Sequence, residues 1–245
     1  KTIYWKLHHQ QIKMIQSGAS GSSSLLIAPT GGGKTLAGFL PSIIELNAYP
    51  TNSLHTIYIS PLKALTVDVA RNLLNPLSEM GLKITVETRT GDTPQSKRQR
   101  QRKSPPNILL TTPESLALLI SYPDSATIFQ ELRCVIIDEL HALAPTKRGD
   151  LLSLALARLN KWAPKARRVG LSATIPYPEE MAEYLSCGQK IKTVQIIQAQ
   201  PTKKPMIQIL IGNSLLPWSG HMGIYAVAEV YEAIQNHKTS LIFVN

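Results

Sequence analysis

The sequence lacks any run of about 18 or more apolar residues, which excludes a helix that crosses a membrane. It has only two cysteines, Cys134 and Cys187, which excludes a disulfide scaffold and a cysteine-based metal site and is typical of a reducing cytoplasm. No histidine spacing resembles a zinc site, and no signal peptide is visible. These absences exclude a membrane-spanning helix and a fold held together by disulfides or by a cysteine-based metal site.

The chain carries a surplus of positive charge. Of its 245 residues, 26 are Lys or Arg and 16 are Asp or Glu, which gives a net charge of +10. This surplus favours a polyanionic partner, with nucleic acid the first candidate; a basic protein without such a partner is the alternative. The apolar share of 43% is ordinary for a globular chain and argues against disorder.

Short apolar runs alternate with segments of helical spacing as far as about Gln189. The runs are apolar throughout, which indicates strands buried on both faces, and the alternation predicts a doubly wound α/β domain. Strands are expected at Leu25–Ala28, Thr56–Ser60, Ile84–Val86, Ile108–Leu110, Cys134–Ile137 and Val169–Leu171. Helices are expected at Lys34–Asn47, Leu62–Met80, Pro113–Ser121 and Gly149–Trp162, with Pro41 and Pro76 kinking or ending the first two.

The pattern changes after Gln189. Strands are predicted at Lys192–Ile197, Met206–Ile211 and Leu241–Val244, and a helix at Ile224–Ile234. The chain begins at Lys1 without a Met and stops within the last of these strands, so we expect a fragment of a longer protein.

A glycine-rich loop follows the first predicted strand and leads into a helix, which is the context of a phosphate-binding loop. Glycines let backbone N–H groups point at a phosphate, and the helix N-terminus adds a favourable dipole. Lys34 would hold the β- and γ-phosphates of ATP, and the Thr35 hydroxyl would bind Mg²⁺. A turn that simply enters a helix is the alternative, and the strict pattern has Gly where this chain has Ala28. The loop comprises Ala28, Pro29, Thr30, Gly31, Gly32, Gly33, Lys34 and Thr35.

An acidic pair follows the predicted strand Cys134–Ile137. Because ligands gather at the carboxyl ends of parallel strands, Asp138 is expected to hold Mg²⁺ and Glu139 to orient and deprotonate the attacking water. With Lys34, these two residues are the predicted catalytic set for nucleoside triphosphate hydrolysis.

The motifs together resemble superfamily 2 helicases. Asp138-Glu139-Leu140-His141 is a DExH box, and Ser172-Ala173-Thr174 follows at a strand end. Ser60–Leu65, Thr90–Thr93 and Thr111–Leu116 complete a series similar to the large helicase-related (Lhr-type) DNA helicases. More narrowly, Glu87–Pro94, Lys147–Asp150 and Pro217–His221 resemble the bacterial ligase-associated DNA damage response DExH-box helicases.

The resemblance implies an α/β fold: a RecA-like P-loop domain with a mostly parallel sheet flanked by helices, plus the start of a second RecA-like domain. Residues 1–190 would form the first domain, 191–222 a connector and 223–245 the beginning of the second. It further implies ATP-driven 3′→5′ movement on single-stranded or tailed DNA, a role in DNA repair with ligase or nuclease partners, and a bacterial cytoplasmic, nucleoid-associated location.

The resemblance also assigns roles to single residues. Gln11, or its neighbour Gln10, would read adenine, unless both only decorate an amphipathic helix. His141, Ser172 and Thr174 would couple hydrolysis to DNA, unless they are cap and turn residues. The predicted DNA contacts, made mostly to phosphates, are Pro61, Lys63, Thr90, Gly91, Thr112, Pro113, Glu114, Lys147 and Arg148. The basic run Lys97–Lys103 could follow DNA or form the solvated face of a helix between Thr93 and Pro105.

Three other functions remain as alternatives. An RNA helicase would share most of these motifs. The chain alone could be a module that binds nucleotide and nucleic acid with little turnover, because arginine fingers come from the second domain. A nucleotide kinase would share the phosphate-binding loop but would not need the DExH box.

Overall fold

The structure, a computed structural model, describes residues 7–29, 31–173, 175–186, 194–199 and 226–243. These residues fall in two units, one within Lys1–Gln200 and one within Pro201–Asn245. The predicted site residues Thr30 and Thr174 lie outside the described residues, as do Cys187 and the strand expected at 206–211.

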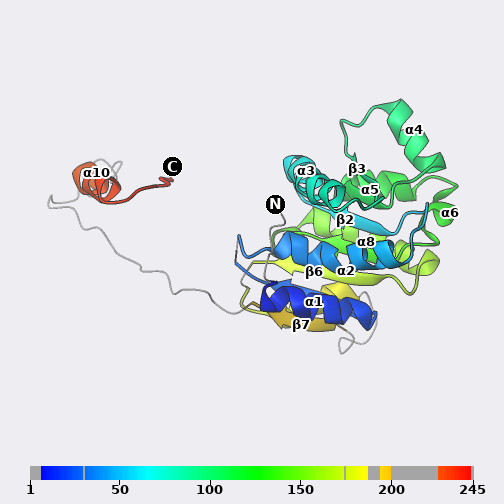
Figure 1. The fold of residues 1–245 in the computed structure, drawn as a ribbon, viewed down its shortest axis with the longest axis horizontal. Coiled ribbons are helices and arrows are strands. Elements are labelled where there is room, and N and C mark those ends of the chain that lie inside the picture. The colour runs from blue at the N-terminus through cyan, green and yellow to red at the C-terminus, as the bar shows by residue number, and fades with distance from the viewer. Residues whose placement is uncertain (1–6, 30, 174, 187–193, 200–225, 244–245) are drawn as a thin grey trace. The chain divides into compact units, whose positions relative to one another are not determined.

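A seven-stranded sheet with parallel pairings forms the centre of the first unit (Figure 1). Its strand order is β3-β4-β2-β5-β6-β1-β7. The strands are β1 (Ser23–Ile27), β2 (Thr56–Ile59), β3 (Val86–Arg89), β4 (Ile108–Thr111), β5 (Cys134–Ile137), β6 (Arg167–Ser172) and β7 (Val194–Gln198). The expected α/β fold of the RecA-like kind is confirmed.

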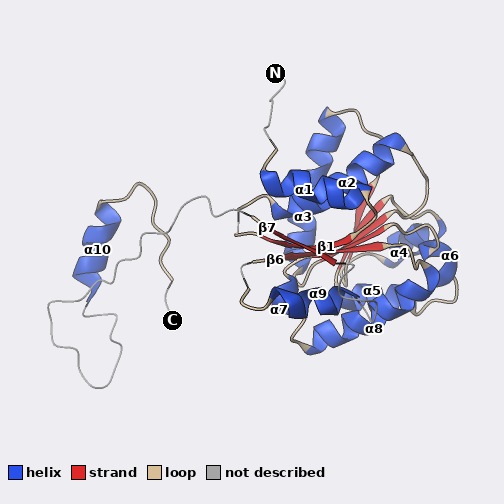
Figure 2. Cartoon of the chain, turned by 90° about the horizontal axis from the view of Figure 1, so that it is seen from below, coloured by secondary structure: helices blue, strands red, loops and turns tan. Residues whose placement is uncertain are grey.

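Helices cover both faces of the sheet (Figure 2). The helices in the described part of this unit are α1 (His9–Ala19), α2 (Lys34–Ala48), α3 (Lys63–Glu79), α4 (Gln95–Lys103), α5 (Pro113–Ile120), α6 (Ser125–Phe129), α7 (Leu140–Leu143), α8 (Lys147–Trp162) and α9 (Pro178–Ser186). Successive strand residues enter different cores: Leu26 and Tyr58 pack with α1, α2 and α3, whereas Ile27 and Ile59 pack with α5, α8 and α9. Burial on both faces explains why the strand sequences are apolar throughout.

The sheet extends further along the chain than the predicted domain limit at residue 190. β7 pairs with β1 from Ser23↔Val194 to Ile27↔Gln198, so the first unit includes residues of the predicted connector. β3 is also displaced from its expected place at Ile84–Val86. It lies at the edge of the sheet, where Glu87 and Thr88 are half-buried, and an edge strand tolerates such polar residues.

Of the two outcomes expected at the prolines, a kink or an end, the helices do not end: α2 continues through Pro41 and α3 through Pro76. Each proline removes one backbone hydrogen bond, but buried apolar residues on both sides hold the helix against the sheet, as Phe39 and Ile43 do in α2. Pro41 also packs closely on α1, because a Cβ at Gly18 would lie 2.4 Å from the Pro41 Cβ. This close approach places the end of α1 against the middle of α2.

The described part of the second unit contains α10 (Val227–Gln235). The strand expected at Leu241–Val244 is wrong for residues 241–243, which form no strand and are exposed. A strand needs a partner for its backbone groups, and the described residues of this unit supply none. No helix in the described parts of the chain is long and apolar enough to span a bilayer.

Candidate nucleotide and nucleic-acid site

The carboxyl ends of the central strands lie at one level. Ile27 of β1 is in register with Ser172 of β6, and Ile59 of β2 is in register with Thr111 of β4 and Ile137 of β5. The loops that follow these strands therefore share one edge of the sheet. Since neighbouring strands lie about 4.8 Å apart, β1 and β5, with β6 between them, are separated by about 10 Å.

The phosphate-binding loop leaves this edge after β1 and enters α2. Gly31 and Gly33 have φ angles of +79° and +70°, which side chains with a Cβ rarely adopt. The Gly32 amide donates to the Pro29 carbonyl at 3.1 Å. The buried Lys34 ammonium donates across the loop to the Ala28 carbonyl at 3.0 Å, and Thr35 follows in the first turn of α2. Two glycines with positive φ and a lysine folded back over them are the features that the predicted phosphate-binding loop requires.

Both candidate adenine-reading glutamines lie against this loop and are buried. The Gln10 amide donates to the Gly32 carbonyl at 3.0 Å. Gln11 accepts from the His8 amide at 2.9 Å, and its Nε2 lies 3.1 Å from where a Cβ of Gly33 would stand. Neither glutamine decorates an exposed helix face, and Gln10 has the direct bond to the loop.

Asp138 is held on both of its carboxylate oxygens. Oδ1 accepts from the Glu139 amide at 2.9 Å, and Oδ2 accepts from the hydroxyl of the buried Tyr58. Burial first, and then the charge of Asp138, raises the pKa of Tyr58 far above its ordinary value. Tyr58 therefore remains a hydrogen-bond donor. Sequence reasoning missed this residue because it reads as one more apolar position of a buried strand.

The DExH box contacts the end of β6 through His141. The Ala173 amide donates to His141 Nδ1 at 3.3 Å, and Oε2 of Glu139 lies 3.5 Å from the same nitrogen. Glu139 itself has φ +46°, the one positive φ among described non-glycine residues. Such strain is common where a functional side chain must be aimed.

The donor set fits a magnesium–nucleotide complex. An ammonium, a hydroxyl and a carboxylate, from Lys34, Thr35 and Asp138, are the groups that bind phosphates and a hydrated Mg²⁺. Between β1 and β5, the hydroxyl of Ser172 is fully buried and has no hydrogen-bond partner among the described residues. No cluster of three His, Cys, Asp or Glu side chains suited to another metal occurs in the described part of the chain.

A second set of predicted residues is tied together by Arg148 at the start of α8. Its guanidinium bonds both carboxylate oxygens of Glu114, at 2.5 and 3.1 Å, and donates to the Pro61 carbonyl at 2.7 Å. The hydrogen bond from Arg148 is the main cause of the lowered pKa of Glu114. Thr112 caps α5 through the Ser115 amide, with Pro113 as the first helical residue. Three predicted DNA-contact segments are thereby fixed relative to one another.

Lys63, the first residue of α3, contacts the loop that follows β3. Its ammonium bonds both carboxylate oxygens of Asp92, at 3.0 and 3.1 Å, and lies 3.3 Å from where a Cβ of Gly91 would stand. Thr90 belongs to the same turn, which is closed by a bond from its amide to the Thr93 hydroxyl at 2.9 Å. The predicted residues Lys63, Thr90 and Gly91 therefore lie together. Lys147 is exposed beside Arg148.

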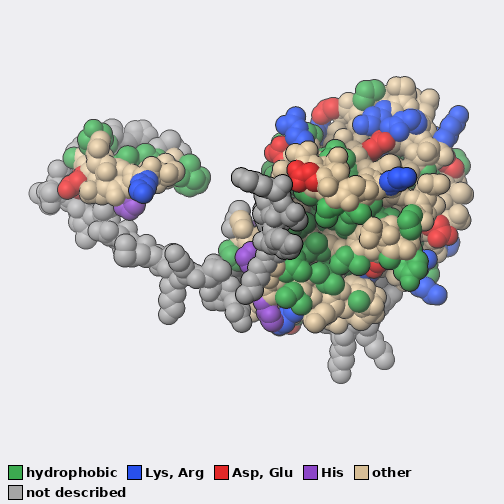
Figure 3. Space-filling view, viewed as in Figure 1, with side chains coloured by type: hydrophobic (Ala, Val, Ile, Leu, Met, Phe, Trp, Pro, Cys, Tyr) green, Lys and Arg blue, Asp and Glu red, His purple; other side chains and the backbone are tan. Residues whose placement is uncertain are grey.

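The basic run forms helix α4, and its arginines have partners within the protein. Arg98 donates to the carbonyls of Thr90 and Gly91, at 3.1 and 2.5 Å. Arg100 pairs with Glu87 at 2.7 Å, and Arg102 with Asp124 at 2.7 Å. Figure 3 shows the same mixture, with Lys and Arg side chains over α3 and α4 interspersed with acidic ones. The run is thus largely structural, and Arg98 supports the predicted DNA-contact loop.

Comparisons with known proteins agree with this arrangement. The profile of the DEAD/DEAH box helicase family matches residues 8–182. The Mycolicibacterium smegmatis protein named Lhr helicase/probable uracil glycosylase is 39% identical over 241 residues, covering 93% of this chain and 16% of that protein. The ATP-dependent helicase Lhr-Core of Methanothermobacter thermautotrophicus is 37% identical over 244 residues, covering 92% of this chain and 28% of that protein.

A solved structure is similar over the whole chain. The structure of the Mycobacterium smegmatis helicase Lhr bound to ssDNA and AMP-PNP has a TM-score of 0.78 and 36% identity, covering 100% of this chain and 32% of that one. The chain therefore spans less than a third of each of these three proteins.

Proposed function

The chain belongs to the DEAD/DEAH box helicase family and is similar to Lhr helicases, and we propose from this premise that it is the nucleotide-binding half of an ATP-dependent motor acting on single-stranded DNA. One observation carries the proposal: the predicted phosphate-binding loop, the acidic pair and the DNA-contact residues of three loops follow strands whose carboxyl ends share one sheet edge. Arg148 bonds two of these three loops. Because both sets of residues lie at the same sheet edge, a change at the bound nucleotide can alter the contacts made to a DNA strand.

In this proposal each residue of the nucleotide site has a distinct role. Lys34 leaves the Ala28 carbonyl to hold the β- and γ-phosphates, and Gln10 or Gln11 reads the adenine. Thr35 and Asp138 hold Mg²⁺, which when bound neutralises phosphate charge. Glu139 accepts the proton of the attacking water on its carboxylate, a step that typically contributes about 10²–10⁴-fold. His141, Ser172 and Thr174 couple ATP hydrolysis at this site to the contacts with the DNA strand.

The DNA contacts proposed here are made to phosphates. Helices α3, α5 and α8 begin at Lys63, Pro113 and Lys147. Helix N-termini favour negative charge, and backbone contacts of this kind position a strand without reading its sequence. The AMP-PNP and ssDNA named for the Mycobacterium smegmatis relative support the choice of ATP and DNA.

Finer parts of the proposal rest on the family resemblance alone. They are 3′→5′ movement, a role in DNA repair with ligase or nuclease partners, the assignment of 223–245 to a second RecA-like domain, and the narrower relation to ligase-associated helicases. Arginines of a complete second domain accelerate phosphoryl transfer by about 10³–10⁵-fold. We therefore expect this chain alone to bind ATP and DNA weakly and to hydrolyse ATP slowly.

The test is phosphate release by the 245-residue chain with no nucleic acid, with single-stranded DNA and with RNA. We expect stimulation by DNA that exceeds stimulation by RNA. Lys34→Ala should abolish binding of a fluorescent ATP analogue, whereas Glu139→Gln should bind it and block turnover. Lys13→Ala, which removes an exposed lysine of α1, is the matched control. Equal stimulation by RNA would overturn the DNA assignment, and nucleotide binding by Lys34→Ala would overturn the site.

A further inference from the structure

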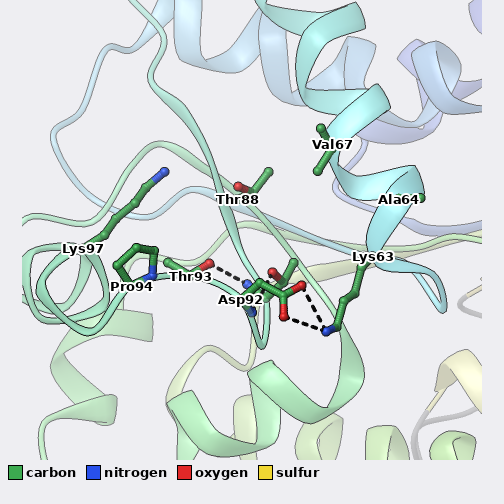
Figure 4. Close-up of a pocket in the computed structure, with 9 residues that line it drawn as sticks. Lys63, Ala64, Val67, Thr88, Asp92, Thr93, Pro94 and Lys97 are labelled. Atoms are coloured by element: carbon green, nitrogen blue, oxygen red, sulfur yellow. Dashed lines mark hydrogen bonds and ion pairs between the residues drawn. The ribbon is translucent and has the colours of Figure 1, made fainter.

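A pocket of about 410 Å³ opens between the beginning of α3 and the loop that leads from β3 to α4 (Figure 4). Lys63 enters it from α3 and Lys97 from α4, with Asp92 and Thr93 between them. The remaining lining residues are Ala64, Val67, Thr88, Thr90 and Pro94. Two ammonium groups and three threonine hydroxyls suit an anion. No aromatic side chain lines the pocket, so it offers no surface on which a base could stack.

An acidic side chain inside this pocket already holds Lys63. The Asp92 carboxylate receives both hydrogen bonds described above, and the pair is open to solvent, with the side chains 55% and 76% exposed. Exposed pairs of this kind are weak and exchange readily for another partner. Asp92 is therefore already bound to the Lys63 ammonium, which is the group that a phosphate in this pocket would have to bind.

The turn that carries Asp92 does not depend on its pairing with Lys63. Thr90 and Thr93 close the turn by reciprocal hydrogen bonds, and Arg98 holds the carbonyls of Thr90 and Gly91 from α4. Among the described residues, Lys63 is the sole partner of the Asp92 carboxylate. Removing its charge should leave the loop in place.

The other ion pair among the predicted DNA contacts is different. Arg148 is fixed both by Glu114 and by the carbonyl of Pro61, so that pair connects three segments of the fold. Lys63 and Asp92 connect only with each other at their charged ends. Of the two ion pairs, the Lys63–Asp92 pair can therefore open without disturbing neighbouring loops, whereas the Arg148–Glu114 pair cannot.

We propose that the pocket between Lys63 and Lys97 is a subsite for a backbone phosphate of the nucleic acid, and that Asp92 is its built-in competitor. The inference rests on the proposed function. A phosphate that binds here displaces Asp92 from Lys63 and then lies beside an unpaired carboxylate, which weakens binding twice: a pair is lost and a like charge is brought near. The weakened grip lets the strand leave the subsite again, as movement along DNA requires.

The first test is Asp92→Asn, which is nearly isosteric. Fluorescence anisotropy of a labelled oligo(dT) should show about three- to tenfold tighter binding at low salt. Between about 50 and 200 mM salt, the slope of log K against log salt should steepen by about 0.7, as for one further phosphate neutralised on a single strand. Glu79→Gln, at the far end of α3 and about 24 Å away along the helix, changes the charge equally and is the control. It should leave affinity unchanged.

A double-mutant cycle separates competition from a mere change in net charge. Lys63→Ala should cost more affinity in the Asp92→Asn background than in the natural one, because only there is the lysine free of its partner. Lys97→Ala should weaken binding several-fold. Two results would contradict the role of Asp92 as a competitor. One is an equal loss of DNA affinity on Lys63→Ala in both backgrounds, and the other is DNA binding by Asp92→Asn that is no tighter than binding by Glu79→Gln. Unchanged binding by Lys97→Ala would overturn the subsite. No DNA binding by the natural chain would instead overturn the proposed function itself.

Discussion

The Tyr58 hydroxyl donates a hydrogen bond to Oδ2 of Asp138, across the neighbouring strands β2 and β5. Tyr58 is fully buried and stacks on Phe39 of α2, with ring centroids 5.2 Å apart. Packing thus fixes the phenol, and the phenol orients the carboxylate that we assign to Mg²⁺. Partners behind a metal ligand typically change metal affinity or activity by about 10–100-fold when removed.

Tyr58→Phe should therefore weaken nucleotide binding in the presence of Mg²⁺ by about tenfold and leave binding without Mg²⁺ unchanged. The ring and its stacking on Phe39 are kept, so the fold should persist. Titration of a fluorescent ATP analogue with and without Mg²⁺ measures both values. Tyr177→Phe, which removes the hydroxyl of an exposed tyrosine, is the control. An equal loss with and without Mg²⁺ would show that Tyr58 acts on the fold rather than on the metal site.

Arg148→Lys should restore little of what Arg148→Ala loses. A lysine keeps the charge, but it cannot bond both oxygens of Glu114 and the Pro61 carbonyl together. We expect both variants to lower affinity for single-stranded DNA by a similar factor, because the loops carrying Pro61 and Glu114 lose their common brace. Anisotropy with oligo(dT) measures this, with Lys161→Ala, an exposed lysine at the far end of α8, as the charge control that should leave affinity unchanged. Full rescue by lysine would make Arg148 a simple phosphate contact.

Most of the sheet could be predicted from the sequence because its strands are buried on both faces. Cys134–Ile137 was predicted at the residues that form β5, and the phosphate-binding loop was placed correctly between β1 and α2. β3 was misplaced because an edge strand mixes polar and apolar residues. The helix predicted at Lys34–Asn47 is α2, and packing holds it through Pro41, where local propensity alone allowed an end.

The missing parts of the candidate site are contacts between distant residues. Tyr58 lies 80 positions from Asp138 in the sequence, and Arg98 supports a loop that its own basic run gave no reason to connect with it. The pairing of Lys63 with Asp92 could not be predicted either, because it depends on how α3 approaches the loop after β3. Motifs identify which residue types are needed, whereas only the fold shows which of them neutralise one another.

Gly149→Ala should destabilise the protein by about 1–3 kcal/mol or more. A Cβ at this position would lie 2.4 Å from the Ala144 carbonyl oxygen and 2.5 Å from that of Leu143, so the backbone between α7 and α8 must move. Gly81→Ala is the comparison, because its Cβ meets open space and only the φ of +67° is unfavourable, at a cost of about 1–2 kcal/mol. Urea unfolding measures both. A smaller loss at Gly149 than at Gly81 would contradict the steric account.

A pH-dependent part of the stability should come from Glu45 of α2. It accepts from Arg167 Nη1 at 2.6 Å and lies 3.1 Å from His55 Nε2. Burial would raise the pKa of Glu45, but the hydrogen bond with His55 and the charge of Arg167 outweigh it, so the pKa lies below its ordinary value of 4.5. A carboxyl group whose pKa is lowered by folding stabilises the folded state at pH values above the pKa that the group has in the unfolded chain. That contribution is lost as the pH falls through the folded value.

Glu45→Gln should therefore lower the free energy of unfolding at neutral pH by about 1–3 kcal/mol, since Arg167 stays buried with a weaker acceptor. The gap to the natural protein should close as the pH falls below about 4.5, because the natural carboxylate is protonated there while the amide does not titrate. Urea unfolding from about pH 7 to about pH 3 measures the gap. Glu131 is an exposed carboxylate near the same end of the sheet, and Glu131→Gln is the control. Its free energy of unfolding should differ from that of the natural protein by the same amount at every pH. If the difference for Glu45→Gln is also the same at every pH, the carboxylate does not gain its stability from these partners.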